Sequence, residues 1–290
     1  TWDISSWGTG RTCLSPATEI EKRFFKTGDK NVSYGGGRSD FLDGVSGAVL
    51  SEIFHENDVI YEKTLVIIEF NDNTSINIRV SRILFRPAHI FSHLKQNNLQ
   101  ELKAAVDYYI NRQINNGDWP ELPENKKRYQ YFLQRVATSF GRVAARFESE
   151  YIFCWMDWDG DNILTNGGLI DFGSVRQFGL YHNEYRYDDV DRFSTTISEQ
   201  KNKAKYIVQT FAQITDYLVS GVKKPINDFR SDPAVKIFTQ VFERSKNELL
   251  MYKTGFNNDS IQSLLNDQHS ASLISSFRSL CTYLETAKSI

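Results

Sequence analysis

The sequence predicts an α+β protein with a small β-rich part over residues 1–92 and a larger helical part over residues 93–290. Two observations lead to this prediction. Residues 64–70 and 75–81 have the composition of strands, whereas most long segments after residue 91 carry apolar residues at helical spacing. The chain has 290 residues, of which 40% are hydrophobic, so it can form a substantial core.

The first part is expected to be a mixture of turns, one helix and a hairpin. Residues 1–45 are rich in Gly, Ser and Thr, which favours turns and short strands. Residues 45–54 have a helical apolar pattern that Gly47 weakens. The run TLVIIEF at 64–70 predicts a strand, the polar residues 71–74 a turn, and the alternating run SINIRVS at 75–81 a second strand. These two strands therefore form a hairpin.

Helices are expected along most of the second part. Residues 99–115 predict a helix with Leu102 and Val106 on its apolar face, and the sequence NGDWP at 116–120 ends it. Residues 127–147 predict the next long helix, because aromatic and aliphatic residues recur at helical spacing. At least three more helices are expected within the ranges 188–216, 233–251 and 260–289.

Composition argues against several classes of protein. The net charge of −2 predicts no broad nucleic-acid surface. The three cysteines are odd in number and widely spaced, which argues against a disulfide framework or a zinc site. The sequence contains no run of about 18 apolar residues, so we expect no membrane span. The first residues resemble neither a signal peptide nor a transit peptide. We expect a cytoplasmic protein, with a delivered effector or toxin domain as the alternative. The oligomeric state stays open.

One segment carries the side chains of a nucleotide site. Asp161 and Asn162 lie in an oxygen-rich turn, a short apolar stretch follows, and Asp171-Phe172-Gly173 closes the segment nine residues after Asn162. Carboxylate and amide oxygens suit Mg²⁺ that carries nucleotide phosphates. The alternative interpretation is a polar loop whose Asp and Asn residues cap turns. An EF-hand is excluded because Asn162 stands where the calcium loop needs glycine.

Several short motifs occur in the order found in a known family. They are Trp2-Asp3-Ile4 with Gly8-Thr9-Gly10-Arg11-Thr12, Gly36-Gly37-Arg38, Ser51-Glu52, Arg79-Val80-Ser81 with Arg86, Asp107-Tyr108-Tyr109-Ile110, Asp161-Asn162 and Asp171-Phe172-Gly173. In this order the chain resembles the selenoprotein-O family over nearly its full length. The resemblance implies a protein-kinase-like bilobal fold with a small β-rich N-lobe and a larger helical C-lobe. It also implies an enzyme that transfers AMP to proteins.

The resemblance also implies how nucleotide would bind. The family holds ATP in a flipped pose, with the γ-phosphate inside and the α-phosphate toward the acceptor. Arg79 and Arg86 would then clamp the γ-phosphate, a task that suits the planar fork of a guanidinium. Gly37 would let the backbone approach the nucleotide, and Asp171 would complete the nucleotide site. The alternative for both arginines is salt bridging at the surface.

The resemblance assigns the metal and the chemistry to the polar segment. Asn162 and Asp171 would bind Mg²⁺, with Mn²⁺ as an alternative ion. Asp161 would accept the proton of a Ser, Thr or Tyr hydroxyl on a protein substrate. Such a reaction depends mainly on positioning and on charge neutralisation, so few residues suffice.

The chain departs from the family pattern at charged positions. Trp7 stands where the family has a phosphate-binding Lys, and Gly47 stands where it has the Glu that pairs with this Lys. Loss of both is self-consistent, because a lone buried charge is costly. The family's glycine-rich loop is expected upstream of Trp2, so either the N-lobe is incomplete at its start or this protein works without the loop.

These departures leave two rival functions open. The first is a kinase-type phosphotransferase on the same scaffold with ATP in the ordinary pose. The second is a catalytically inactive pseudokinase that serves as a binding module. Trp7 and Gly47 favour this alternative, and the retained Asp161, Asn162 and Asp171 oppose it.

Overall fold

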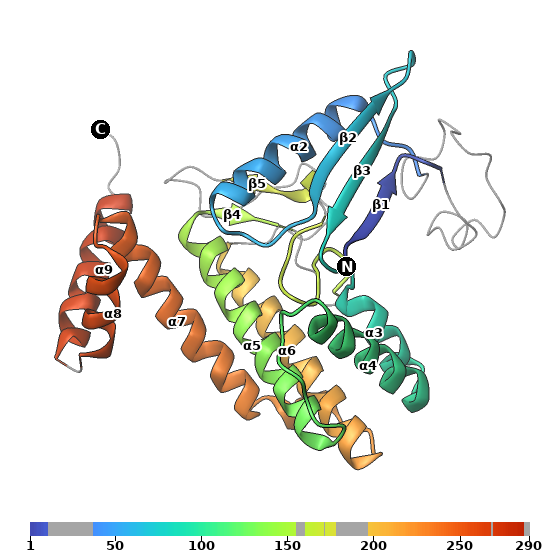
Figure 1. Ribbon diagram of the computed structural model, residues 1–290. Coiled ribbons are helices and arrows are strands. Elements are labelled where there is room, and N and C mark those ends of the chain that lie inside the picture. The colour runs from blue at the N-terminus through green and yellow to red at the C-terminus, as the bar shows by residue number, and fades with distance from the viewer. Residues whose placement is uncertain (11–36, 155–159, 171, 178–196, 268, 287–290) are drawn as a thin grey trace. The chain divides into compact units, whose positions relative to one another are not determined.

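The structure is a computed structural model that describes residues 1–10, 37–154, 160–170, 172–177, 197–267 and 269–286 (Figure 1). The chain divides into two compact units. We call Thr1–Phe85 with Gly168–Gly173 the sheet unit, and Arg86–Gly167 with Ser174–Ile290 the helical unit. The combination of a small sheet with many helices confirms the α+β class. The predicted division after residue 92 stays a prediction.

The sheet unit contains a three-stranded antiparallel sheet (Figure 1). Its strands are β1 (Asp3–Trp7), β2 (Lys63–Glu69) and β3 (Ser75–Ser81), in the spatial order β1-β3-β2. The pairing of β2 with β3 confirms the predicted hairpin, in which Ile68 lies opposite Ile76.

The polar side chains of β3 are the buried ones. Ser75, Asn77, Arg79 and Ser81 are buried, while the isoleucines and valine between them are half-buried. The reason is helix α2 (Phe41–Glu56), which confirms the helix predicted over 45–54 and packs on β2 and β3. A Cβ at its Gly44 would lie 2.1 Å from Asn77 Oδ1, so a small residue is needed for this close approach.

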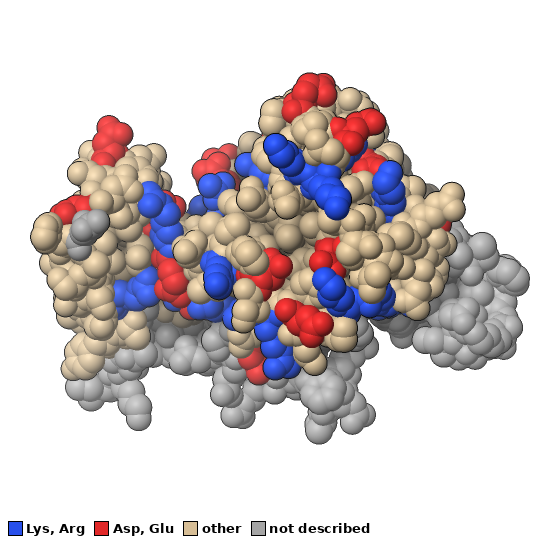
Figure 2. Space-filling view, turned by 90° about the horizontal axis from the view of Figure 1, so that it is seen from below, with Lys and Arg blue, Asp and Glu red and all other residues tan. Residues whose placement is uncertain are grey.

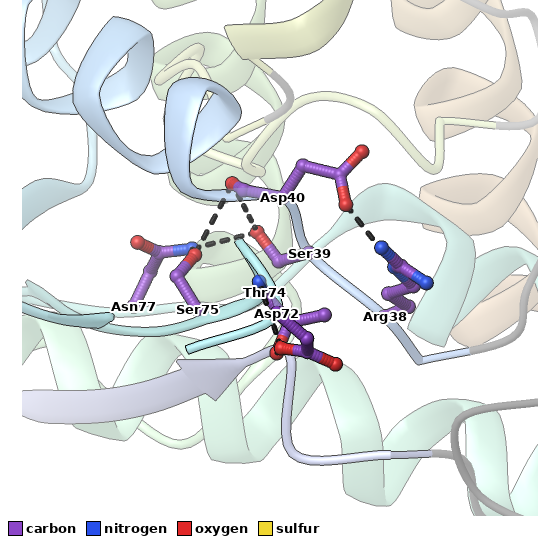
Figure 3. Close-up of polar contacts among 7 residues, drawn as sticks. All are labelled: Arg38, Ser39, Asp40, Asp72, Thr74, Ser75 and Asn77. Atoms are coloured by element: carbon purple, nitrogen blue, oxygen red, sulfur yellow. Dashed lines mark hydrogen bonds and ion pairs between the residues drawn. The ribbon is translucent and has the colours of Figure 1, made fainter. Parts of the chain in front are cut away.

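A polar network fixes the start of α2 on β3 (Figure 3). Asn77 Nδ2 donates to Ser39 Oγ at 2.7 Å, and Ser75 Oγ donates to the backbone oxygen of Asp40 at 3.1 Å. In the adjacent turn the Thr74 hydroxyl donates to Asp72 at 2.6 Å, which holds the pKa of Asp72 below its ordinary value. The network therefore sets both the helix position and the hairpin turn.

Glycines bring two further loops against this network. Gly8 has a φ of +86°, and a Cβ there would lie 2.0 Å from the backbone oxygen of Ser75. Gly10 N–H donates to the oxygen of Gly37 at 2.9 Å, and Gly37 itself has a φ of +68°. Both geometries favour glycine, because other residues rarely adopt left-handed backbone conformations.

The helical unit is built on long helices that pack side by side (Figure 1). Its described elements are α3 (Pro87–Lys95), α4 (Leu99–Asn115), α5 (Lys126–Ser149), β4 (Ile152–Phe153), β5 (Arg176–Gln177), α6 (Ile197–Ser220), η2 (Ile226–Phe229), α7 (Pro233–Lys253), α8 (Asn258–Asn266) and α9 (Ser270–Thr286). Helix α5 contacts both α6 and α7. Fully buried aromatic residues fill this core, among them Phe132, Phe140, Phe211 and Phe238. The helices predicted over 99–115, 127–147 and 233–251 are confirmed.

Two predicted helical ranges differ from the structure. The range 188–216 is described only from residue 197, where α6 begins. The range 260–289 contains two helices, α8 and α9, because Asp267 interrupts the chain. Its carboxylate accepts hydrogen bonds from His269 N–H at 3.0 Å and from the Ser270 hydroxyl at 3.0 Å. These bonds begin a new helix, as capping side chains do.

Residues of both charge signs occur on the surface of the described part of the chain. Figure 2 shows Lys and Arg interspersed with Asp and Glu on the face in view. Among the described residues, every helix is too short or too polar to cross a membrane.

Candidate functional site

In the helical unit, Asp161, the predicted proton acceptor, contacts Arg86, one of the two predicted phosphate ligands. Arg86 Nη1 lies 2.9 Å from Asp161 Oδ1, and the two side chains are 31% and 58% exposed. Exposed ion pairs of this kind contribute little to stability. The pair has the form of the surface salt bridge that was the alternative for Arg86.

The turn that carries Asp161 is docked on the start of α3. Ala88 N–H donates to the oxygen of Gly160 at 3.2 Å. Gly160 has a φ of +74°, and a Cβ there would lie 2.4 Å from Pro87 Cβ. On the other side of the turn, Ile163 and Leu164 are fully buried. A solvent-exposed carboxylate thus projects from a turn that is fixed on both sides.

Asn162 is half-buried beside Asp161, and Asp171 lies outside the described residues. The described part of the chain contains no group of three or more His, Cys, Asp and Glu side chains placed to hold a metal ion. Mg²⁺ does not need such a group, because one or two protein oxygens together with substrate phosphates and waters can complete its coordination. Among the described residues, the side-chain oxygen of Asn162 fits this chemistry.

His89 is the titratable neighbour of the Arg86–Asp161 pair. Its Nδ1 accepts a hydrogen bond from Arg86 N–H at 3.3 Å. Burial lowers the pKa of His89 below its ordinary value of 6.5, the Arg86 charge lowers it further, and Asp161 acts in the opposite direction. The fold therefore favours the neutral ring, whose Nδ1 can accept the bond.

We predict that His89 makes the protein less stable in acid. The unfolded chain binds a proton near the ordinary pKa of 6.5, before the folded chain does. The free energy of unfolding should be highest above this pH, fall as the pH drops through it, and level off below the folded pKa. Urea denaturation at several pH values would measure this slope. The His89→Gln variant should have a shallower slope, and an equal slope in both proteins would contradict the assignment to His89.

In the sheet unit, Arg79 is buried in an ion pair. Its Nη1 lies 2.6 Å from Glu62 Oε1, and the side chains are 7% and 2% exposed. The same Nη1 donates to the backbone oxygen of Ile170 at 3.3 Å. Arg79 Nε has no hydrogen-bond partner among the described residues. The surface salt bridge that was the alternative for Arg79 is therefore not what the structure contains.

Aromatic rings lie beside the Arg79 guanidinium. The Trp7 ring centre lies 4.1 Å from Arg79 Cζ, and the Phe172 ring centre lies 5.7 Å from it. A Cβ at Gly47 would lie 3.7 Å from Arg79 Nη2 and 3.5 Å from the Phe172 ring. Trp7 and Gly47 thus both border one buried arginine.

The predicted site residues that the structure describes fall into two groups. Arg86 and Asp161 are brought together in the helical unit, next to Asn162 in the sequence. Arg79 and Gly37 belong to the sheet unit, where Gly37 takes part in the glycine loops. Sequence reasoning missed Glu62, because a Glu between Tyr61 and Lys63 has no local pattern that indicates burial.

Comparison with known proteins finds a distant relative. No model of a protein family matches the chain. A protein of Lachnoclostridium phytofermentans, named protein nucleotidyltransferase YdiU, is 24% identical over 177 residues, which cover 57% of this chain. The match spans 34% of the relative, so this chain is similar to about a third of a longer nucleotidyltransferase.

Proposed function

We propose that this protein is a divergent member of the selenoprotein-O family with a protein-kinase-like fold. It transfers AMP from ATP to Ser, Thr or Tyr hydroxyls of protein substrates and depends on Mg²⁺. The observation that carries the proposal is the exposed Asp161 carboxylate, held on a turn that Gly160 docks on α3. The similarity to a protein named nucleotidyltransferase supports the same reaction class.

Asp161 accepts the proton in the proposed reaction. The substrate hydroxyl oxygen attacks the α-phosphorus of ATP, its proton passes to the Asp161 carboxylate, and the bond from the α-phosphorus to pyrophosphate breaks. A fixed carboxylate at the attacking oxygen is the usual arrangement for this proton transfer. Asn162 and Asp171 hold Mg²⁺, which neutralises the phosphate charge when it is bound.

The arginines and Gly37 bind nucleotide in this proposal. A guanidinium carries five N–H donors, so Arg86 can contact Asp161 and still donate to a phosphate. Arg79 engages Glu62 through Nη1, and its Nε and Nη2 form the other edge of the fork. Gly37, with its left-handed backbone, offers a surface without a side chain.

The test is incubation with ATP, Mg²⁺ and a mixture of candidate protein substrates, followed by intact-protein mass spectrometry. We expect products heavier by AMP and none heavier by phosphate. Products heavier by phosphate alone would replace the proposal with a kinase-type phosphotransferase.

One observation favours a second candidate, an inactive binding module. Arg79 is already neutralised by Glu62 within the sheet unit, and Trp7 supplies no charge at the Lys position. Thermal unfolding separates this candidate from an enzyme, because a ligand that binds the folded state raises its stability. ATP at ten times its Kd stabilises by about 1.4 kcal/mol. No thermal shift with millimolar ATP and Mg²⁺ would favour the inactive module.

A further inference from the structure

A buried ion pair connects distant segments of the sheet unit. Arg79 belongs to β3, and Glu62 directly precedes β2. Arg79 Nη1 also donates to the oxygen of Ile170, a residue 91 positions later in the chain. One guanidinium nitrogen therefore joins the hairpin to the segment that precedes Asp171 in the sequence.

Backbone hydrogen bonds hold the same segment. Glu62 N–H donates to the oxygen of Leu169 at 3.0 Å, and Leu169 N–H donates to the oxygen of Ile60 at 3.0 Å. Glu62 thus contributes its backbone to Leu169 and its side chain, through Arg79, to Ile170. A displacement of Glu62 would disturb both attachments.

Aromatic packing closes this arrangement. Phe172 stacks on Phe54 of α2, with ring centres 5.9 Å apart, and lies near the Arg79 guanidinium. Gly47 leaves the space for the Phe172 ring and the arginine. The described residues on both sides of Asp171, Ile170 and Phe172, are therefore held by Arg79 and its neighbours.

Stability alone does not explain why two charges are buried here. Removing a carboxylate and a guanidinium from water costs several kcal/mol, and apolar residues of similar volume are often as stable. What apolar residues cannot supply is a donor for the Ile170 oxygen. The placement of the pair points to a positioning role.

We propose that Glu62 is a positioning residue that acts through its pair with Arg79. Besides the nucleotide contact proposed for Arg79, the pair holds Gly168–Ile170 and Phe172, the described residues on both sides of Asp171, for binding of metal and nucleotide. The part that concerns Asp171 rests on the proposed function. The part that concerns the segment rests only on the contacts within the sheet unit.

Hydrogen exchange of the Leu169 amide tests the segment directly. In the Glu62→Gln variant, Arg79 loses its charged partner and the amide should exchange about tenfold faster than in the wild type. The matched control is Glu52→Gln, which breaks the exposed Lys63–Glu52 pair at 3.0 Å and should leave this exchange unchanged. Equal exchange in the wild type and Glu62→Gln would overturn the proposal.

A double variant separates positioning from general stability. Glu62→Leu combined with Arg79→Met removes both charges, so global stability should return toward the wild type. Exchange at Leu169 should remain fast, because no side chain donates to Ile170. Recovery of slow exchange in the double variant would show that the pair only fills space, and would overturn the proposal.

Binding of Mn²⁺ together with a non-hydrolysable ATP analogue, followed by electron paramagnetic resonance, tests the link to Asp171. We expect at least about tenfold weaker Mn²⁺ binding in Glu62→Gln than in Glu52→Gln, as for other residues that support metal ligands. Equal binding would overturn the link. If the wild type binds no Mn²⁺ while Leu169 exchange still responds to Glu62→Gln, the proposed function fails and the positioning of the segment stands.

Discussion

The Asp161→Asn variant should transfer AMP about 10²- to 10⁴-fold more slowly than the wild type, the usual contribution of a general base. Asparagine has nearly the same shape as aspartate, but its amide cannot take the proton of the attacking hydroxyl. The turn should keep its position, because Gly160 and the buried Ile163 hold it independently of the carboxylate. Intact-protein mass spectrometry over time would measure the rate.

Binding measurements show whether the loss is chemical. Isothermal titration should give an ATP Kd within about threefold of the wild type, since Asp161 acts mainly in the reaction step. Asp228→Asn is the control, because it makes the same exchange at an exposed position in η2. Asp171→Ala, in contrast, should abolish transfer by removing a proposed metal ligand. A full rate in Asp161→Asn would refute its role as the base.

The Gly8→Ala variant should lose about 2–5 kcal/mol of unfolding free energy. About 1–2 kcal/mol comes from placing a Cβ on a left-handed residue with a φ of +86°. About 1–3 kcal/mol more comes from overlap, because the Cβ would lie 2.0 Å from the backbone oxygen of Ser75. That oxygen belongs to β3 and cannot move away as a flexible side chain could.

A second glycine separates these two contributions. Gly221 has a φ of +73°, but apart from its chain neighbours no atom of the described residues lies within 4 Å of the position its Cβ would take. Gly221→Ala should therefore cost only the backbone strain of about 1–2 kcal/mol. Urea denaturation would compare the two variants. Equal losses would show that the approach of Gly8 to Ser75 does not constrain the fold.

Local sequence patterns predict much of the secondary structure, because they depend on neighbouring residues. The β2–β3 hairpin follows from two β-rich runs around a polar turn, and α4 and α5 follow from apolar residues at helical spacing. Such patterns fail where one polar side chain changes the outcome. Asp267 divides the last predicted helical range into two helices through its hydrogen bonds to His269 and Ser270. A single Asp in a polar stretch does not reveal this division in the sequence.

For the candidate site, too, the sequence predicts some features and leaves others to the tertiary structure. The spacing of Asp161, Asn162 and Asp171 along the chain predicts a metal and nucleotide segment, and this stays a prediction. The partners of these residues are less visible. Glu62 looks like a surface residue in the sequence, yet it is 2% exposed and pairs with Arg79.

The sequence by itself thus determined the α+β class, the order of most helices and strands, and the oxygen-rich segment around Asp161. Only the tertiary structure decided that the polar face of β3 lies against α2, that Arg86 contacts Asp161, and that Glu62 neutralises Arg79. The physical reason is that periodicity reports how neighbouring residues share a face. Which faces meet depends on small residues such as Gly44 and on pairings between distant segments.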